Sequence, residues 1–160
     1  MRLGFIGTGK ITSSVITGIC NSKISFKRIL VSPRNKSVAQ KLKKQFKKVL
    51  IAKNNQEIVN SCNWVFLAVT PKVGKKILPS LKFRSNQKVI SFIATINLAQ
   101  LKKTLGKKIK IIRAIPLPPI SLKKGPVPIC PPDRKVKSFF DKIGTTVEVK
   151  NEKLSKNFWA

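Results

Sequence analysis

The sequence contains no histidine and no tyrosine, and only 5 of its 160 residues are Asp or Glu. Few side chains are therefore present for general acid–base catalysis near neutral pH. The three cysteines, Cys20, Cys62 and Cys130, are far apart and show no Cys-x-x-Cys spacing. With no histidine to join them, they predict no metal site, and we expect reduced thiols in a cytoplasmic protein.

Long apolar runs are absent too. Gly and Lys interrupt the apolar residues of the N-terminus, and no apolar run elsewhere reaches about 18 residues. We therefore expect neither a signal peptide nor a membrane-spanning helix. A length of 160 residues with 42% hydrophobic content predicts one domain with one core.

Basic residues dominate the charge, with 34 Lys and Arg and a formal net charge of +29. Lysines occur in nearly every segment, which favours a general enrichment on solvated faces over a dedicated polyanion surface. A basic module that binds nucleic acid or another polyanion stays an alternative, although nucleic acid is not the favoured partner. It would use residues 41–48, 75–76, 102–103 and 107–110, and it predicts one coherent positive face with steep salt dependence.

The first dozen residues, MRLGFIGTGKIT, predict a short strand, a tight turn and a helix that begins at once. Gly7 permits the sharp turn, and Gly9 lets the backbone approach a pyrophosphate closely. The first N–H groups of the helix are unpaired donors at the positive end of its dipole. Thr12 occupies the third position of the G-x-G-x-x-G/A pattern, so the match is imperfect. This order predicts a dinucleotide-binding turn, and a glycine-rich turn without a ligand is the alternative.

The end of the second predicted strand, residues 28–32, bears on which dinucleotide would bind. An NAD-binding unit usually carries an Asp or Glu there for the ribose hydroxyls, but no acidic residue lies between Gly9 and Glu57. Ser32, Arg34 and Lys36 can instead bind a 2′-phosphate through charge-assisted hydrogen bonds. The sequence therefore favours NADP(H), and the alternative is that Arg34 is a solvated turn charge.

Short apolar runs alternate with helical patterns, at residues 3–6, 28–32, 49–52, 64–69, 89–93 and 110–114. This alternation predicts an α/β fold of the Rossmann type, with a mostly parallel, doubly wound sheet and helices on both faces. We expect Ser37 to cap the second helix and Asp133 to cap the last one, which a strand at 145–149 follows.

Residues 115–133 are rich in proline, and we expect them to be extended rather than helical, with an edge strand at 127–130. A linker or a proline-rich ligand segment is the alternative. We identify no partner within the chain for residues 151–160.

Several segments together resemble one enzyme family, in the order GFIGTGKI, VSPRN, NNQE, VFLAVTPKV, VISFIATINLAQL, KIIRAIPLPP and FDKIGTTVEV. From Met1 to about Lys156 the chain resembles the N-terminal, NADP-binding domain of pyrroline-5-carboxylate reductase. The resemblance implies hydride transfer from NADPH to the C=N bond of 1-pyrroline-5-carboxylate, a small-molecule imine, giving L-proline in proline biosynthesis. A related NADP oxidoreductase with another substrate, such as a deazaflavin-dependent one or a prephenate-type dehydrogenase, stays open.

The resemblance also implies site residues, although it assigns no catalytic one. The pyrophosphate cradle would be Gly7, Thr8, Gly9, Lys10 and Ile11, and the adenosine end Ser32, Arg34, Asn35 and Asn55. The ribose and nicotinamide side would be Ala68, Val69, Thr70 and Pro71, with Ala94 and Thr95 on the next strand end. Substrate-side candidates are Pro116, Leu117 and Pro118, for which plain extended packing is the alternative.

The chain departs from the family pattern at four places. Lys10 replaces a usual Asn, Thr70 a usual Lys, Thr95 a usual Gly, and Leu117-Pro118 the usual Asn-Thr of M-P-N-T-P. These changes affect the substrate assignment more than NADP binding.

The resemblance divides the chain into an NADP-binding domain at 1–150 and, at 151–160, the start of a linker to a helical dimerisation domain. We expect that second domain to be absent from this chain, which would then be a fragment or truncated product. A homo-oligomer is expected only where that domain is present. Phe158 and Trp159 would be exposed, either at a cut interface or at a disordered end.

Overall fold

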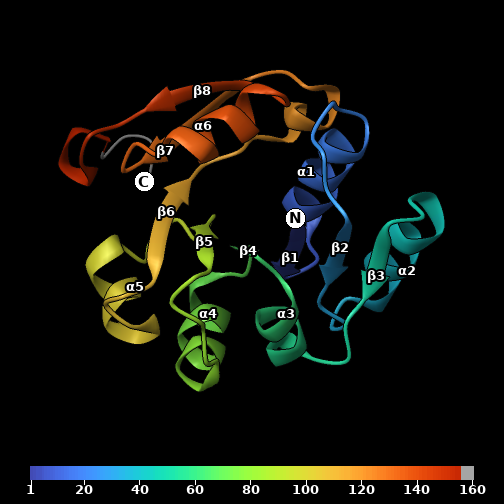
Figure 1. Cartoon of the computed structure of the whole chain (residues 1–160), viewed down its shortest axis with the longest axis horizontal. Helices are drawn as coiled ribbons and strands as arrows, with labels where there is room; N and C mark the ends of the chain where they lie inside the picture. Colours follow the sequence, from blue (N-terminus) through green and yellow to red (C-terminus); the bar gives the residue numbers. More distant parts are fainter. Residues whose placement is uncertain (156–160) are drawn as a thin grey trace.

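The computed structural model describes residues 1–155, and its centre is an eight-stranded sheet in the order β3-β2-β1-β4-β5-β6-β7-β8 (Figure 1). Strands β1 to β6 are parallel, β7 is antiparallel to β6, and β8 is parallel to β7. The predicted mostly parallel sheet is thereby confirmed. The strands are β1 (Arg2–Ile6), β2 (Arg28–Val31), β3 (Val49–Ile51), β4 (Trp64–Leu67), β5 (Lys88–Ser91), β6 (Lys110–Ala114), β7 (Pro126–Cys130) and β8 (Thr145–Glu148).

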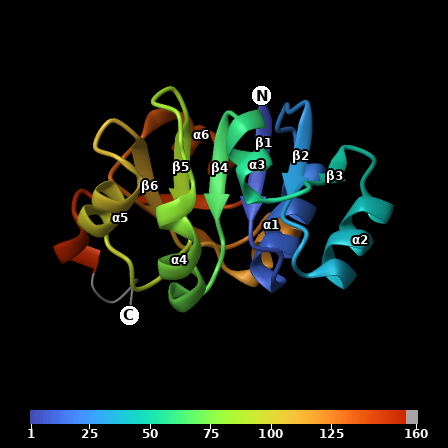
Figure 2. The same ribbon diagram turned by 90° about the horizontal axis from the view of Figure 1, so that it is seen from below.

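Helices cover both faces of the sheet (Figures 1 and 2). One face carries α1 (Lys10–Cys20), α2 (Lys36–Gln45) and α6 (Arg134–Asp141), and the other carries α3 (Asn55–Ser61), α4 (Pro71–Ile77) and α5 (Leu98–Leu105). Short 3-10 helices are η1 (Leu78–Ser80), η2 (Pro118–Leu122) and η3 (Glu152–Ser155). The two helical layers give the doubly wound architecture that the alternating pattern predicts.

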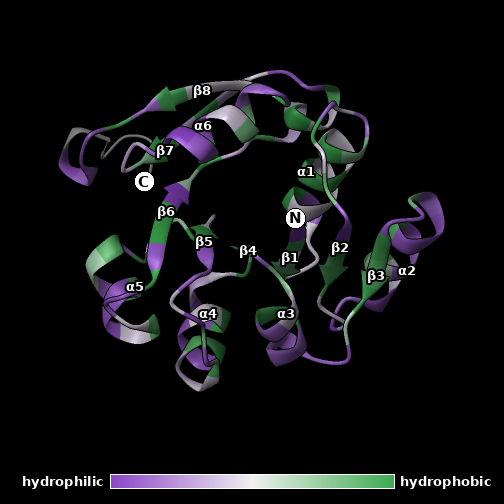
Figure 3. Cartoon of the chain, in the orientation of Figure 1, coloured by the Kyte–Doolittle hydropathy of each residue, from purple (hydrophilic) through white to green (hydrophobic). Residues whose placement is uncertain are grey.

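Alternate residues of each strand supply the two cores, since successive side chains point to opposite faces. In β1, Leu3 and Phe5 belong to the cluster under α1, and Ile6 belongs to the cluster under α3 to α5. The rings of Phe5 and Phe66 stack at 4.5 Å between centroids. The central strands are therefore mostly hydrophobic, and hydrophilic residues gather on the outer helices (Figure 3).

The chain reverses its direction of travel across the sheet at β1, which lies between β2 and β4. Gly7 follows β1, Ser32 follows β2 and Ala68 follows β4, so these residues meet at one edge. Open α/β sheets bind ligands in the crevice at such a switch point.

The cap of α2 differs from the prediction. Helix α2 begins at Lys36, and its cap is Asn35, whose Oδ1 accepts a hydrogen bond from Val38 N at 3.4 Å. Ser37 is inside the first turn, and its hydroxyl donates to the same Asn35 Oδ1 at 3.3 Å. The predicted cap at Asp133 is observed, and Asn54 caps α3.

The proline-rich stretch also differs. Residues of η2 form a 3-10 helix, so the expectation of a purely extended chain is wrong. The prolines at its start are tolerated because the N–H group that a proline lacks would be unpaired in a first helical turn anyway. Strand β7 is internal, because β8 forms the edge. It tolerates Pro128 because that residue faces β6, where the ladder holds only two residue pairs and Ile115 N donates to Pro128 O at 3.0 Å.

The tail after β8 has a partner, contrary to expectation. Glu152 accepts hydrogen bonds from Leu98 N at 2.8 Å and from Arg113 at 3.1 Å. Phe158 and Trp159, expected to be exposed, lie outside the described residues.

Candidate functional site

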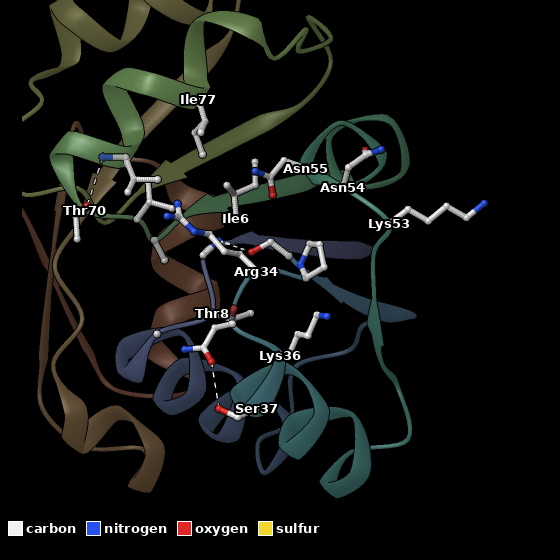
Figure 4. Close-up of a pocket in the computed structure, with 18 residues that line it drawn as sticks. Ile6, Thr8, Arg34, Lys36, Ser37, Lys53, Asn54, Asn55, Thr70 and Ile77 are labelled. Carbon is white, nitrogen blue, oxygen red and sulfur yellow. Dashed lines mark hydrogen bonds between the residues drawn. The ribbon is translucent and has the colours of Figure 1, made fainter.

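A cavity of about 990 Å³ opens at the carboxyl ends of β1, β2 and β4 (Figure 4). Ten predicted site residues line it: Gly7, Thr8, Gly9, Ser32, Arg34, Asn35, Asn55, Ala68, Val69 and Thr70. Lys36, also predicted to bind a 2′-phosphate, lines it as well, and seven more residues complete the lining: Ile6, Pro33, Ser37, Lys53, Asn54, Val73 and Ile77. Residues from four separate loops therefore meet in one cleft.

The glycine turn after β1 is fixed by its two neighbouring strands. Gly7 has φ +105°, and a Cβ there would lie 2.2 Å from Ala68 O, so only glycine fits. Its N–H donates to Ser32 Oγ at 2.8 Å, and its carbonyl accepts from Thr12 Oγ1 at 2.8 Å. Thr12, the imperfect third position of the motif, thus closes the turn with its hydroxyl. Ser32 anchors the turn while retaining its own hydroxyl proton to donate.

The amino end of α1 differs from those of the other α-helices within residues 1–155. Side chains cap the five others, namely Asn35, Asn54, Thr70, Asn97 and Asp133. The cap of α1 is Gly9, which has no side chain to accept a bond, and no acidic residue lies in the first turn. A Cβ at Gly9 would meet nothing within 4 Å. The first amides of α1 therefore remain open, with the positive end of the helix dipole behind them.

Two buried polar atoms in the lining are unpaired. Thr8 Oγ1 and Asn55 Oδ1 have no hydrogen-bond partner in the described part of the chain. Buried polar groups in proteins are nearly always hydrogen-bonded. These two atoms therefore mark places where the polar groups of a bound molecule would complete the site.

The charge of the cleft is positive. Arg34 extends across the cavity toward the α4 side, whereas Lys53 extends away from it (Figure 4). The lining defined by residues 1–155 contains no acidic side chain. Glu57, the nearest acid along the chain, accepts a hydrogen bond from Lys53 N at 2.5 Å. An anionic ligand would therefore meet cations and open amides without a repelling carboxylate.

The other predicted site residues do not line this cavity. Lys10 and Ile11 begin α1, and Pro71 begins α4. Ala94 and Thr95 are exposed in the loop after β5. The substrate-side candidates follow β6, where Pro116 is buried and Leu117 and Pro118 are exposed.

Sequence reasoning did not assign Lys53 or Asn54 to the site, nor Val73 and Ile77. Lys53 and Asn54 follow β3, which pairs with β2, and so they reach the same sheet edge as Arg34. The signal available in the sequence was their position directly after a predicted strand. The apolar pair is spaced by four residues, which places both on one face of α4.

A family model described as NADP oxidoreductase, coenzyme F420-dependent, matches residues 2–95. The chain belongs to this family. Among curated relatives, pyrroline-5-carboxylate reductase of Synechocystis is 30% identical, with 93% of this chain and 58% of that protein aligned. The enzyme of Escherichia coli is 29% identical over 81% of this chain and 49% of its own length. The predicted resemblance is confirmed, and the chain spans about half the length of these relatives.

Solved structures of similar proteins share the fold. Pyrroline-5-carboxylate reductase of Streptococcus pyogenes has a TM-score of 0.81 at 24% identity, covering 99% of this chain and 60% of that one. The Plasmodium falciparum enzyme with NADP bound has a TM-score of 0.82 at 23% identity, covering 96% and 59%.

The lysines proposed for a polyanion surface lie on both faces of the sheet. The Lys-rich helix α2 covers one face, and the lysines of α4 and α5 cover the other. This arrangement does not favour the single positive face that the alternative requires. Within residues 1–155, no helix has both the length and the apolar composition to cross a bilayer.

Proposed function

We propose that this chain is the NADP(H)-binding domain, at residues 1–150, of a reductase that converts 1-pyrroline-5-carboxylate to L-proline. The observation that carries the proposal is the uncapped amino end of α1 beside a cavity that contains Arg34 and no carboxylate. Family membership and the names of the relatives support the same direction.

The lining residues suit the chemistry of the dinucleotide. The amides after Gly9 would hold the diphosphate, because they are open and lie at the positive dipole end. Arg34, with Lys36 beside it, would hold the 2′-phosphate, since a guanidinium can donate two parallel hydrogen bonds to one phosphate. Thr8 Oγ1 and Asn55 Oδ1 would gain the hydrogen-bond partners that they lack in the described chain.

When bound, NADPH supplies the hydride, and the protein supplies placement and exclusion of competing reactions. The cavity lies at the ends of β1, β2 and β4, so the adenosine half would extend toward β2 and the nicotinamide half toward β4 and β5. The reducing end of the cofactor would then lie near the loops that carry Ala94 and Leu117.

Titration of the purified chain with NADPH and with NADH tests this proposal. We expect NADPH to bind more tightly, and Arg34→Ala to remove most of that preference while leaving NADH affinity unchanged. The expected loss is about tenfold to a hundredfold, the value of one charge-assisted hydrogen bond.

Lys41→Ala is the matched control, because Lys41 is exposed on α2 and does not line the cavity. It should leave both affinities unchanged, apart from a general effect of net charge. Equal binding of NADPH and NADH by the unmodified chain would contradict the role of Arg34.

A further inference from the structure

A buried arginine lies behind the two loops that the main cavity leaves out. Arg113, in β6, is 3% exposed. One end of its guanidinium, Nη2, donates to Ile93 O at 3.2 Å and also to Ala94 O. The guanidinium therefore holds the backbone of the loop after β5 by hydrogen bonds to two of its carbonyls.

The other end of the guanidinium meets the segment that follows β8. Arg113 Nη1 lies 3.1 Å from Glu152 Oε1. The same carboxylate oxygen accepts a hydrogen bond from Leu98 N, at the start of α5, at 2.8 Å. Glu152 thus joins β6, the amino end of α5 and the chain after β8 at one point.

Apolar packing joins the same three segments. Cys130 and Val149 form a small buried cluster, against which Leu98 and Ile115 pack. Ile115 is the residue directly after β6, and its N–H is held by Pro128 O. The starts of both loops, 94–97 and 115–118, are therefore tied to the Arg113–Glu152 pair or to its immediate surroundings.

The position of these loops gives the pair a role in the proposed reaction. They follow β5 and β6, the next strands along the sheet edge after β4. With the diphosphate at α1 and the adenosine half toward β2, the second half of the dinucleotide must extend toward these strand ends. Resting on the proposed function, we propose that Arg113 and Glu152 are a positioning pair that fixes the β5 and β6 end loops for the nicotinamide half of the cofactor.

The chemistry of the pair suits this task. A guanidinium presents several donors in a rigid plane, so it can bind two carbonyls and a carboxylate at fixed angles, whereas a lysine ammonium holds no such plane. Removing the carboxylate takes one ionic contact away from a buried positive charge, which favours rearrangement of the surrounding backbone. The loop carbonyls of Ile93 and Ala94 would be affected, because both accept hydrogen bonds from the same guanidinium.

The test compares two ligands on the same chain. NADPH occupies both halves of the site, and its nicotinamide fluorescence reports that half directly; adenosine 2′,5′-bisphosphate occupies only the adenosine half. For Glu152→Gln we expect the Kd of NADPH to rise about tenfold with loss of the bound nicotinamide fluorescence, as loose positioning costs such factors. The Kd of adenosine 2′,5′-bisphosphate should stay within about twofold, the size of a surface perturbation.

Arg113→Lys is the second variant, and it keeps the charge while losing the planar fork. It should show the same selective loss to a smaller degree. Asp141→Asn is the control, because it removes the charge of the exposed Lys137–Asp141 pair on α6 while its amide oxygen can still accept the bond from Thr146 N. Urea unfolding of each variant shows whether it remains folded.

The outcomes separate the two proposals. If neither NADPH nor adenosine 2′,5′-bisphosphate binds the unmodified chain, the proposed function itself is refuted. If both bind, and the two variants either keep full NADPH affinity or lose both ligands equally, the positioning role is wrong and the pair is only structural.

Discussion

Gly9→Ala separates ligand binding from folding at the amino end of α1. The added Cβ meets nothing within 4 Å, and the residue has φ −89°, which alanine adopts without strain. Alanine is a poorer helix cap than glycine, which lowers the stability, and it restricts the unfolded chain, which raises the stability. Each effect is about 0.5–1 kcal/mol. The free energy of unfolding should therefore change by less than about 1 kcal/mol.

Binding should respond much more strongly to the same change. The methyl group would occupy open space beside the amino end of α1, where a diphosphate needs N–H···O distances of about 2.9 Å. Loss of one or two charge-assisted hydrogen bonds, at about 1.5–3 kcal/mol each, corresponds to at least a tenfold rise in the Kd of NADPH. Calorimetric titration measures the affinity, and urea unfolding measures the stability.

Gly7→Ala is the matched comparison on the same turn. Its positive φ costs an alanine about 1–2 kcal/mol, and the contact with Ala68 O adds to this, so this variant should lose stability. If Gly9→Ala binds NADPH as tightly as the unmodified chain, the diphosphate does not lie at α1 and the reasoning fails.

Two further predictions concern titrating groups. Burial alone would raise the pKa of Asp133, but hydrogen bonds from Val136 N, Lys88 and Lys110 lower it to about 2. The stability that this carboxylate adds is therefore present above the ordinary carboxyl pKa and disappears as pH falls toward 2. The urea midpoint of Asp133→Asn should accordingly fall less steeply with decreasing pH than that of the unmodified chain. Burial raises the pKa of Cys62 to about 11, so an aromatic disulfide reagent at pH 8 should label it only after unfolding, and rapid labelling in the native state would contradict its burial.

Local sequence patterns were sufficient for most of the fold and for the glycine turn. The spacing of Gly7 and Gly9 after an apolar run predicts the strand, turn and helix directly, because each step depends on neighbouring residues. The contact of Ser32 with Gly7 could not be read in this way, because it depends on β2 lying beside β1. Lys53 and Asn54 were missed for the same reason, since only the pairing of β3 with β2 brings them to the cleft.

Errors elsewhere had equally specific causes. A choice among neighbouring capping residues placed the start of α2 two residues late, because Asn35 and Ser37 are both good caps and only the backbone decides between them. The bond from Arg113 to Glu152 joins residues 39 positions apart, and no local pattern encodes it.

The most direct test of the central claim is a crystal structure of this chain in complex with NADP. We expect the diphosphate oxygens within hydrogen-bond distance of the first amides of α1, and the 2′-phosphate against the guanidinium of Arg34. A dinucleotide bound away from the Gly7–Gly9 turn, or with its 2′-phosphate facing open solvent, would contradict the account.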